Sequence, residues 1–386
     1  MTRPRVLIAH PYFSAVGGGN AVAAWAIEAL RDDFAVTLAT FGDIDYAAIN
    51  QSFGTSLRPG DAELRIAPAV YQALLRSVPT PGALLQACLI TRWARSLDAK
   101  HRYDTLLSTQ NEMDFGRPAL QYVHYPWVYL PRPDIEMRWF HRIPGLLTAY
   151  RDFCKRLSGG SNEGLSRGIF LANSRFIAGK IREVHGAEST VLYPPAPGVF
   201  PDVPWAARRS AAIAIGRMHG CKRWEMAVEI LDRVRSQGLD LSLTLIAHRD
   251  DPEYGSRIAS LAASRPWFRI LYNISREQLV AEVTQHRYGI HTMENEHFGI
   301  AVAELVRGGA IPFVHDSGGP VEVVGGRREL RFQDTVTGAA ALSAVVRNPS
   351  LQLELRRFLA EHGKLFSPAE FRGSLRRIVE AGIHHG

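Results

Sequence analysis

Short runs of apolar residues alternate with longer amphipathic stretches along the whole chain. Such runs are typical of parallel strands buried on both faces, and the stretches between them are typical of the helices that cover a parallel sheet. In the first half of the sequence we predict a helix from Asn20 to Arg31. Strands are predicted at Val6–Ala9, Ala35–Phe41, Tyr103–Ser108, Leu120–His124 and Gly168–Ala172.

The same pattern restarts after the proline-rich segment Leu192–Gly198, which cannot continue a helix or a central strand. Helices are predicted at Arg223–Ser236 and Arg276–His286, and strands at Ala211–Gly216, Leu241–Ala247, Phe268–Leu271, Gly289–His291 and Ile311–Val314. We therefore predict an α/β protein with two Rossmann-like domains, residues 1–195 and 196–366. A C-terminal helix, 367–386, is expected to pack on either domain and can cross back to the first.

Composition narrows the class of protein and of partner. The 386 residues are 46% hydrophobic and 22% charged, which is typical of a folded globular protein. The net charge of +7 favours anionic partners such as nucleotides, phosphorylated lipids, membrane surfaces or RNA. No apolar run reaches the roughly 18 residues that span a bilayer. Three separated cysteines favour a reducing compartment. We expect a cytoplasmic protein, with peripheral contact at the inner face of the membrane as an option.

Two glutamates near position 300 form the sharpest motif. Glu296 and Glu304 lie eight residues apart, after a predicted strand and in what is expected to be one helix. Glu296 is placed at the helix N-terminus, where free N–H groups bind anions. Eight helical residues span roughly 12 Å, about the length of a sugar nucleotide from hexose to ribose. The structural alternative is a capping glutamate and a hydrogen-bonded core glutamate.

Two cations follow the first strand of the second domain. Arg217 and Lys222 lie on either side of a turn that opens a helix. A guanidinium and an ammonium together suit a diphosphate whose charge must be neutralised. The alternative is a solvated basic turn.

Glycine-rich turns follow two other strands. Gly18 and Gly19 allow a ligand close to the backbone before the first helix, but Val22 breaks the dinucleotide fingerprint and no Gly-Lys-Ser/Thr follows. The glycine-containing loop Asp316–Glu322 follows a later predicted strand, and we expect it to allow a similarly close approach. A tight turn is the structural alternative.

His124 ends a predicted strand of the first domain and is expected to face a ligand there, although a lone histidine is as often a core residue. The segment from Trp127 to Arg156 is rich in aromatic and basic residues. It suits an acceptor or membrane-docking surface, or amphipathic helices that pack on the domain.

Taken together, Gly-Arg followed by Lys, then Glu-x7-Glu, then Ser-Gly-Gly-Pro resembles glycosyltransferase family 4, a retaining GT-B family. The segments Val123–Pro126, Tyr193–Pro195 and Thr292–Ile300 are similar to the GDP-mannose-dependent α-1,2-mannosyltransferases of lipid-linked oligosaccharide assembly. The resemblance is strong over about residues 168–325 and weak between Ile44 and Leu120.

The resemblance implies a role for each matching residue. Glu296 and His124 would bind the donor hexose, and Glu304 the ribose. The diphosphate would lie on Arg217 and Lys222, with backbone amides offered by Phe298, Gly299 and Ile300, while Gly18 and Gly19 would lie near the phosphates and the acceptor. No metal or other cofactor is expected. The donor would be a nucleotide sugar, with GDP-mannose as the best guess, and the acceptor a glycan, a lipid-linked or a small-molecule hydroxyl.

Two other classes stay open on the sequence. A nucleotide-sugar epimerase of the same fold would act without an acceptor. A non-catalytic protein that binds nucleic acid or another anion would use the basic surface alone, although nucleic acid is disfavoured by the polar residues at every expected donor position.

Overall fold

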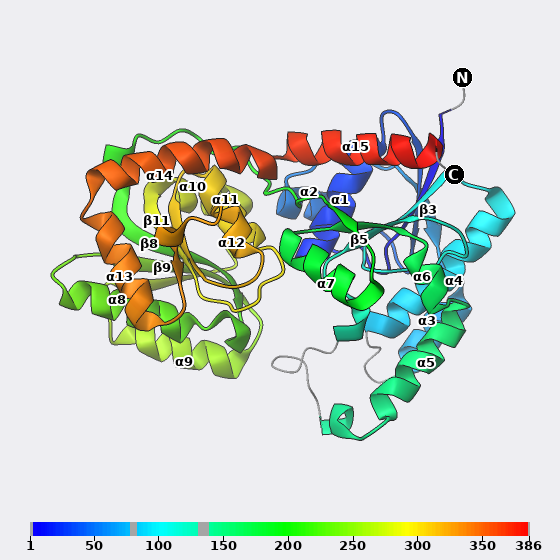
Figure 1. Cartoon of the computed structure of the whole chain (residues 1–386), viewed down its shortest axis with the longest axis horizontal. Coiled ribbons are helices and arrows are strands. Elements are labelled where there is room, and N and C mark those ends of the chain that lie inside the picture. The colour runs from blue at the N-terminus through cyan, green and yellow to red at the C-terminus, as the bar shows by residue number, and fades with distance from the viewer. Residues whose placement is uncertain (1–2, 78–82, 130–138, 385–386) are drawn as a thin grey trace. The chain divides into compact units, whose positions relative to one another are not determined.

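The computed structural model describes residues 3–77, 83–129 and 139–384. The chain divides into two compact units (Figure 1). Unit 1 comprises Met1–Pro194 and Pro368–Gly386, and unit 2 comprises Pro195–Ser367. Each unit is built on one sheet whose described strand pairs are all parallel, so the predicted α/β fold class is confirmed.

Unit 1 has a seven-stranded sheet in the order β3-β2-β1-β4-β5-β6-β7. Its strands are β1 (Arg5–Ala9), β2 (Ala35–Thr40), β3 (Glu63–Ile66), β4 (Thr105–Ser108), β5 (Leu120–Val123), β6 (Ile169–Ala172) and β7 (Ser189–Val191). The sequence pattern did not predict β3 and β7, the two edge strands. Both are short and none of their residues is fully buried, so they lack the apolar run that marks a central strand.

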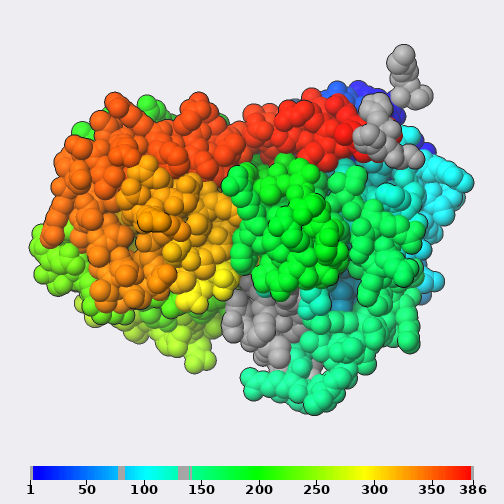
Figure 2. All heavy atoms as spheres, viewed as in Figure 1, coloured from blue at the N-terminus to red at the C-terminus, as the bar shows by residue number. Residues whose placement is uncertain are grey.

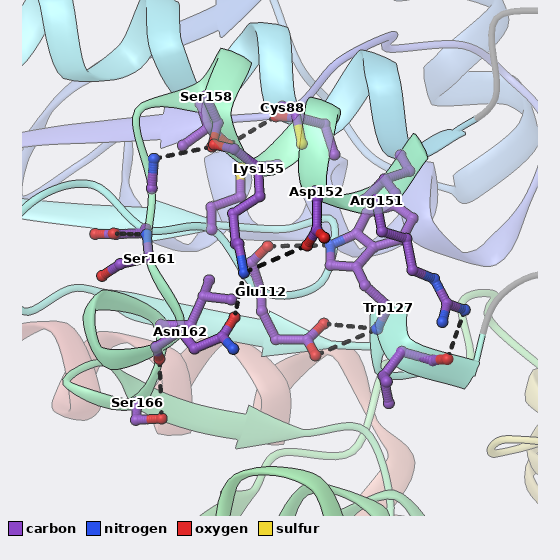
Figure 3. Close-up of a pocket in the computed structure, with 18 of the residues that line it drawn as sticks. Cys88, Glu112, Trp127, Arg151, Asp152, Lys155, Ser158, Ser161, Asn162 and Ser166 are labelled. Carbon is purple, nitrogen blue, oxygen red and sulfur yellow. Dashed lines mark hydrogen bonds and ion pairs between the residues drawn. The ribbon is translucent and has the colours of Figure 1, made fainter. Parts of the chain in front are cut away.

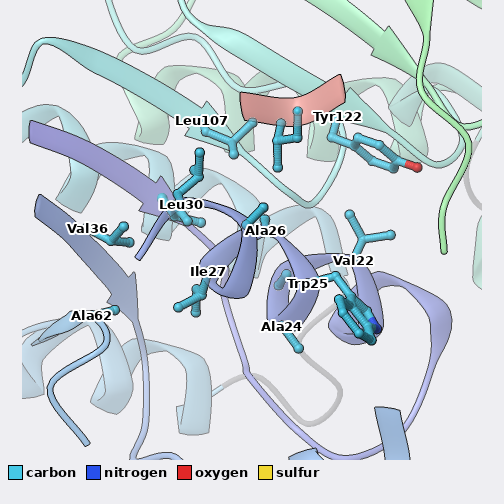
Figure 4. Close-up of a cluster of buried hydrophobic side chains, with 14 of the residues drawn as sticks. Val22, Ala24, Trp25, Ala26, Ile27, Leu30, Val36, Ala62, Leu107 and Tyr122 are labelled. Carbon is cyan, nitrogen blue, oxygen red and sulfur yellow. The ribbon is translucent and has the colours of Figure 1, made fainter. Parts of the chain in front are cut away.

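Helices cover both faces of this sheet and pack hydrophobic clusters against it. They are α1 (Gly18–Leu30), α2 (Tyr46–Phe53), α3 (Ala69–Ser77), α4 (Ala83–His101), α5 (Leu146–Ser158), α6 (Asn162–Ser166), α7 (Arg175–His185) and α15 (Pro368–His384), with 3-10 turns η1 (Trp127–Tyr129) and η2 (Trp139–Arg142). One core lies around α1, which is buried from Ala21 to Leu30 (Figure 4). A second core lies around α4, and a smaller cluster lies between β5, β6 and α7.

The C-terminal helix belongs to unit 1. Phe371, Leu375 and Val379 of α15 are buried in the same core as α1, and the helix lies along the surface of that unit (Figure 2). Residues from the two ends of the chain therefore share one hydrophobic core.

Unit 2 has a six-stranded sheet in the order β10-β9-β8-β11-β12-β13. Its strands are β8 (Arg209–Met218), β9 (Ser242–Arg249), β10 (Phe268–Tyr272), β11 (His286–His291), β12 (Ile311–His315) and β13 (Arg331–Phe332). All five predicted strands are present. β11 begins three residues before its predicted start, because α10 ends at Gln285 and His286 already has extended backbone angles.

The helices of unit 2 pack on both faces of its sheet. They are α8 (Trp224–Ser236), α9 (Pro252–Ala263), α10 (Arg276–Gln285), α11 (Ile300–Arg307), α12 (Pro320–Val323), α13 (Thr335–Val346) and α14 (Pro349–His362). The 3-10 turns are η3 (Trp205–Ala207), η4 (Gly220–Lys222), η5 (Arg328–Leu330) and η6 (Gly363–Phe366). Nearly every residue of α11 from Val302 to Val306 is buried, which fixes this helix firmly against the sheet.

Candidate functional site

Each sheet has a switch point, where the order of its strands reverses. In unit 1 it lies between β1 and β4, and in unit 2 between β8 and β11. Open parallel sheets bind ligands at the carboxyl ends of the strands beside such a point. Lys222 follows β8 and Glu296 follows β11, so the sequence places both at the edge where a ligand is expected.

Glu296 lies in the loop between β11 and α11, not at the helix N-terminus as predicted. α11 begins only at Ile300, because Gly299 adopts a left-handed conformation with φ of 92°. The expected span of roughly 12 Å along one helix from Glu296 to Glu304 is therefore wrong, since half of that segment is not helical.

The glycines of the Asp316–Glu322 segment support the Glu296 loop. The backbone N–H of Gly319 donates to the carbonyl of Glu296 at 2.8 Å. A Cβ at Gly318 would lie 2.3 Å from that carbonyl oxygen, and one at Gly319 would lie 2.4 Å from the carbonyl oxygen of His297. The sequence analysis expected a ligand to approach the backbone of the Asp316–Glu322 loop closely. In the structure, the backbone of the Glu296 loop lies at that close distance.

Lys222 and Glu296 form an ion pair at this edge. The ammonium donates to the carboxylate, and the two side chains are only 12% and 18% exposed. The stem of Lys222 passes Gly216, where a Cβ would lie 3.3 Å from Cε of the lysine. Burial is the largest single influence on the pKa of Glu296 and acts to raise it, but the Lys222 ammonium and the neighbouring His291 and His297 together outweigh burial and hold this pKa well below 4.5. Glu296 is therefore a carboxylate, which accepts hydrogen bonds and does not donate them.

His291, at the end of β11, was missed by the sequence analysis. Its Nε2 lies 3.6 Å from the carboxylate of Glu296 and has no hydrogen-bond partner among the described residues. Burial and the nearby Lys222 ammonium lower the pKa of His291 to about 3, so the ring is neutral near pH 7. His124 was selected from the sequence because it ends a predicted strand. His291 also ends a strand, so the same criterion could have identified it.

Glu304 is paired with an arginine that the sequence did not reveal. Nη1 of Arg276 donates to the Glu304 carboxylate at 2.5 Å, and the two side chains are 14% and 7% exposed. Arg276 also donates to the carbonyl of Pro197. Arg276 opens α10, and in the sequence it is one of many charges at a helix start, so no spacing identified it. The ribose role of Glu304 stays a prediction.

The ion pair that Arg217 forms is with Asp250 and not with Glu296. Arg217 is at the end of β8 and its guanidinium pairs with Asp250 at 3.0 Å, half exposed. Of the two predicted cations, Lys222 is thus the one that contacts Glu296. Ile300 begins α11, and first-turn N–H groups have no acceptor within a helix. The amide role of Phe298, Gly299 and Ile300 stays a prediction.

In unit 1 the structure brings Gly19 and His124 together. A Cβ at Gly19 would lie 3.6 Å from Nε2 of His124 and 3.2 Å from the Gln110 side-chain oxygen. Nε2 of His124 donates to the carbonyl of Thr109 at 3.0 Å. Burial lowers the pKa of His124 to about 4. The neutral ring therefore keeps Nδ1 as an acceptor. Gly18 is the first residue of α1, two positions earlier than predicted.

His10, after β1, is a further buried histidine beside this turn. Its Nδ1 lies 2.9 Å from the Thr109 hydroxyl and its Nε2 lies 2.8 Å from Oδ1 of Asn20. Asn20 in turn donates to the carbonyl of Val16, closing the glycine turn. Burial lowers the pKa of His10 to about 4. Its place directly after a strand could have indicated it.

Curated relatives share sequence with this chain, although no family model matches it. A GDP-Man:Man(3)GlcNAc(2)-PP-Dol alpha-1,2-mannosyltransferase of Dictyostelium discoideum is 26% identical over 194 residues, 43% of this chain and 36% of that protein. The protein of the same name from Caenorhabditis elegans is 24% identical over 363 residues, 81% of this chain and 76% of that protein. The matched region thus spans about a third of the length of the Dictyostelium relative.

Solved structures match along nearly the whole chain. Sucrose-phosphate synthase from Thermosynechococcus elongatus superposes with a TM-score of 0.68 at 15% identity, over 100% of both chains. Anabaena Alr3699/HepE in complex with UDP and glucose has a TM-score of 0.66 at 12% identity, over 98% of this chain and 100% of that one. The chain has the GT-B fold.

The segment from Trp127 to Arg156 lies between β5 and β6 of unit 1 and contains η1, η2 and most of α5. Arg132 and Arg138 lie outside the described residues. Trp139 of η2 is 77% exposed. In α5, Phe153 is 55% exposed whereas Cys154 is fully buried, so one face of this helix packs on the unit and another is exposed to solvent. Contact with a membrane stays a prediction. In the described ranges no helix is long and apolar enough to cross a membrane, and no three His, Cys, Asp or Glu residues group as metal ligands.

Four buried histidines of this GT-B chain should make its stability depend on pH. Burial lowers the pKa of His10, His124 and His286 to about 4 and that of His291 to about 3, whereas an unfolded histidine titrates near 6.5. Below pH 6.5 the unfolded chain binds protons that the folded chain does not. We therefore expect the free energy of unfolding to be highest above pH 6.5 and to fall toward pH 4, by at most about 1.4 kcal/mol per pH unit for each histidine.

Urea unfolding between pH 7.5 and 4.5, followed by circular dichroism, measures this slope. His286→Asn should make the dependence of the free energy of unfolding on pH shallower. A free energy of unfolding that stays constant from pH 6.5 to 5, where carboxylates contribute little, would contradict the expectation.

Proposed function

We propose that the protein is a retaining glycosyltransferase that moves a hexose from a nucleotide-diphosphate sugar to a hydroxyl group of an acceptor. The observation that carries this proposal is the partly buried Lys222–Glu296 pair beside the switch point of unit 2. An ammonium for phosphate and a carboxylate for sugar hydroxyls are the two groups that a nucleotide sugar requires at one place. GDP-mannose is the proposed donor, supported by the names of the relatives, which are GDP-Man-dependent alpha-1,2-mannosyltransferases. A family 4 assignment belongs to the same proposal.

Each site residue has a proposed role. Lys222 holds the diphosphate, aided by the amides of Phe298, Gly299 and Ile300, and Glu296 accepts hydrogen bonds from the hexose. Glu304 holds the ribose with Arg276 as its fixed partner, and Arg217 turns from Asp250 toward phosphate. In unit 1, Gly18 and Gly19 let substrate approach the backbone, and Nδ1 of His124 accepts from a sugar hydroxyl.

The proposed reaction needs no protein nucleophile. The bond from the anomeric carbon to the diphosphate oxygen breaks, and the acceptor oxygen forms its bond on the same face of the sugar. The acceptor proton passes to an oxygen of the departing diphosphate. Lys222 stabilises the negative charge that develops there. We propose that this ammonium serves in place of a metal cofactor.

A thermal-shift screen with GDP-, UDP-, ADP- and dTDP-sugars, followed by a transfer assay with the donor that binds, tests the function. A donor at a hundred times its Kd should add about 2.7 kcal/mol to stability, and we expect GDP-mannose to give the largest shift. Epimerised sugar nucleotide formed without any acceptor would indicate an epimerase instead. Salt-dependent RNA binding without any donor shift would indicate a non-catalytic binding protein.

The acceptor is proposed to be a glycan, lipid-linked or small-molecule hydroxyl compound. Peripheral membrane contact through the exposed face of α5 is part of this proposal. Leu146 and Phe153 are 44% and 55% exposed on that helix, close to several basic residues. Co-sedimentation with vesicles that contain anionic lipid measures this contact, and protein that stays entirely in the supernatant would rule it out.

A further inference from the structure

A pocket of about 470 Å³ lies wholly within unit 1, and the proposed reaction uses none of its residues. Its walls come from α4, α5, α6, the segment that follows β4, the turn η1 and the last residues of α7. The volume falls in the range of small-molecule sites, about 300–1,000 Å³.

The pocket contains a buried carboxylate. The Glu112 side chain is 2% exposed and accepts from Nε2 of His185 at 3.0 Å. Its two oxygens share the backbone N–H of Trp127, at 3.3 and 3.2 Å (Figure 3). A carboxylate can accept about four hydrogen bonds, so two donors leave capacity for hydroxyl groups of a ligand.

An aromatic ring and apolar side chains line the same pocket. The indole N–H of Trp127 donates to the carbonyl of Glu112 at 3.0 Å, which fixes the ring beside the carboxylate. Met113 and Leu165 add apolar surface. A fixed aromatic ring beside a hydrogen-bond acceptor suits a ligand with hydroxyl groups on one side and C–H groups on the other.

The charges of the pocket favour a neutral ligand over an anionic one. The described lining includes three carboxylates but only two lysine or arginine side chains: Glu112, Asp114, Asp152, Arg151 and Lys155. Both cations are already engaged. Lys155 contacts Asp152 at 3.8 Å and Asn162 at 3.3 Å (Figure 3), and Arg151 donates to the carbonyl of Val128 at 2.6 Å.

We propose that this pocket binds a neutral saccharide. The ligand is one sugar unit of the glycan that accepts the transferred hexose, an assignment that rests on the proposed function. Glu112 accepts hydrogen bonds from its hydroxyl groups, and Trp127 packs on its C–H face. The pocket would then select a glycan acceptor over a small alcohol.

Calorimetry and saturation-transfer NMR with methyl α-mannoside and a neutral mannose trisaccharide test the proposal on the full chain. We expect Glu112→Gln to weaken saccharide binding by about tenfold, because a charged acceptor is lost. Thr148→Trp, at an exposed position on the rim, should block the pocket without changing the core. The matched control is Glu163→Gln, an exposed glutamate of α6 outside the pocket, which should bind as the unsubstituted chain does.

Three results would overturn the proposal: no saccharide binding at millimolar concentration, binding that neither pocket variant weakens, or tighter binding of mannose 6-phosphate than of the neutral sugar. GDP binding is measured on the same samples. Saccharide binding without GDP binding would contradict the proposed transfer, and with it the identity of the ligand as an acceptor, but would leave the binding of a neutral saccharide in the pocket standing. GDP binding without saccharide binding would contradict the pocket assignment alone.

Discussion

Glu296→Gln is expected to reduce hexose transfer by roughly a hundredfold to a thousandfold, the loss seen when one group that stabilises a transition state is removed. The carboxylate is held ionised beside Lys222, so the oxygen lone pairs that do not accept from this ammonium can accept from sugar hydroxyls. An amide of the same shape replaces one acceptor oxygen with a donor. The rate of transfer from GDP-mannose at saturating donor measures the effect.

Two comparisons isolate the role of this carboxylate. Glu294→Gln changes a glutamate two residues earlier in the same loop, 48% exposed and paired with Arg223, and should retain near-normal transfer. Circular dichroism and thermal unfolding establish that both variants are folded. Transfer by the folded Glu296→Gln protein at the unsubstituted rate would remove Glu296 from the proposed mechanism.

Lys222→Met is expected to raise the Kd for GDP roughly ten- to a hundredfold, or about 1.4–2.8 kcal/mol. Methionine keeps most of the aliphatic stem that passes Gly216 but removes the charge that would face the diphosphate. Transfer should fall as well, because the leaving group loses its cation. Calorimetric titration with GDP gives the Kd directly.

The neighbouring arginine provides the control. Arg223→Met removes a positive charge one residue away, from a side chain that is 37% exposed and paired with Glu294, and should change the Kd by less than about threefold. An unchanged Kd for GDP in Lys222→Met would exclude this lysine from the nucleotide site, whatever the rate of transfer.

The sequence predicted the parts of the fold that local chemistry determines. Central strands such as β1 and β12 are continuous apolar runs, and burial requires such runs. β3 and β13 were missed because edge strands this short have no such pattern. Strand-end position correctly brought Lys222 and Glu296 to one edge, because parallel strands share their direction.

Other parts of the site depend on tertiary contacts that the spacing of residues along the sequence does not reveal. Arg276 and Glu304 are 28 residues apart and meet because α10 and α11 pack into the same hydrophobic cluster of unit 2. The helix that was expected to begin at Glu296 begins at Ile300, since a glycine can take helical or left-handed angles and the sequence alone does not choose. The buried state of His291 likewise follows from packing.

The shared core of α1 and α15 has a consequence for biosynthesis. During translation, most of unit 1 leaves the ribosome well before its last segment, which contains Phe371, Leu375 and Val379. Until then the apolar side chains of unit 1 that pack on α15 are not covered by it, so the core around α1 is completed last. The nascent chain therefore has a late, vulnerable stage at which chaperones would be needed most.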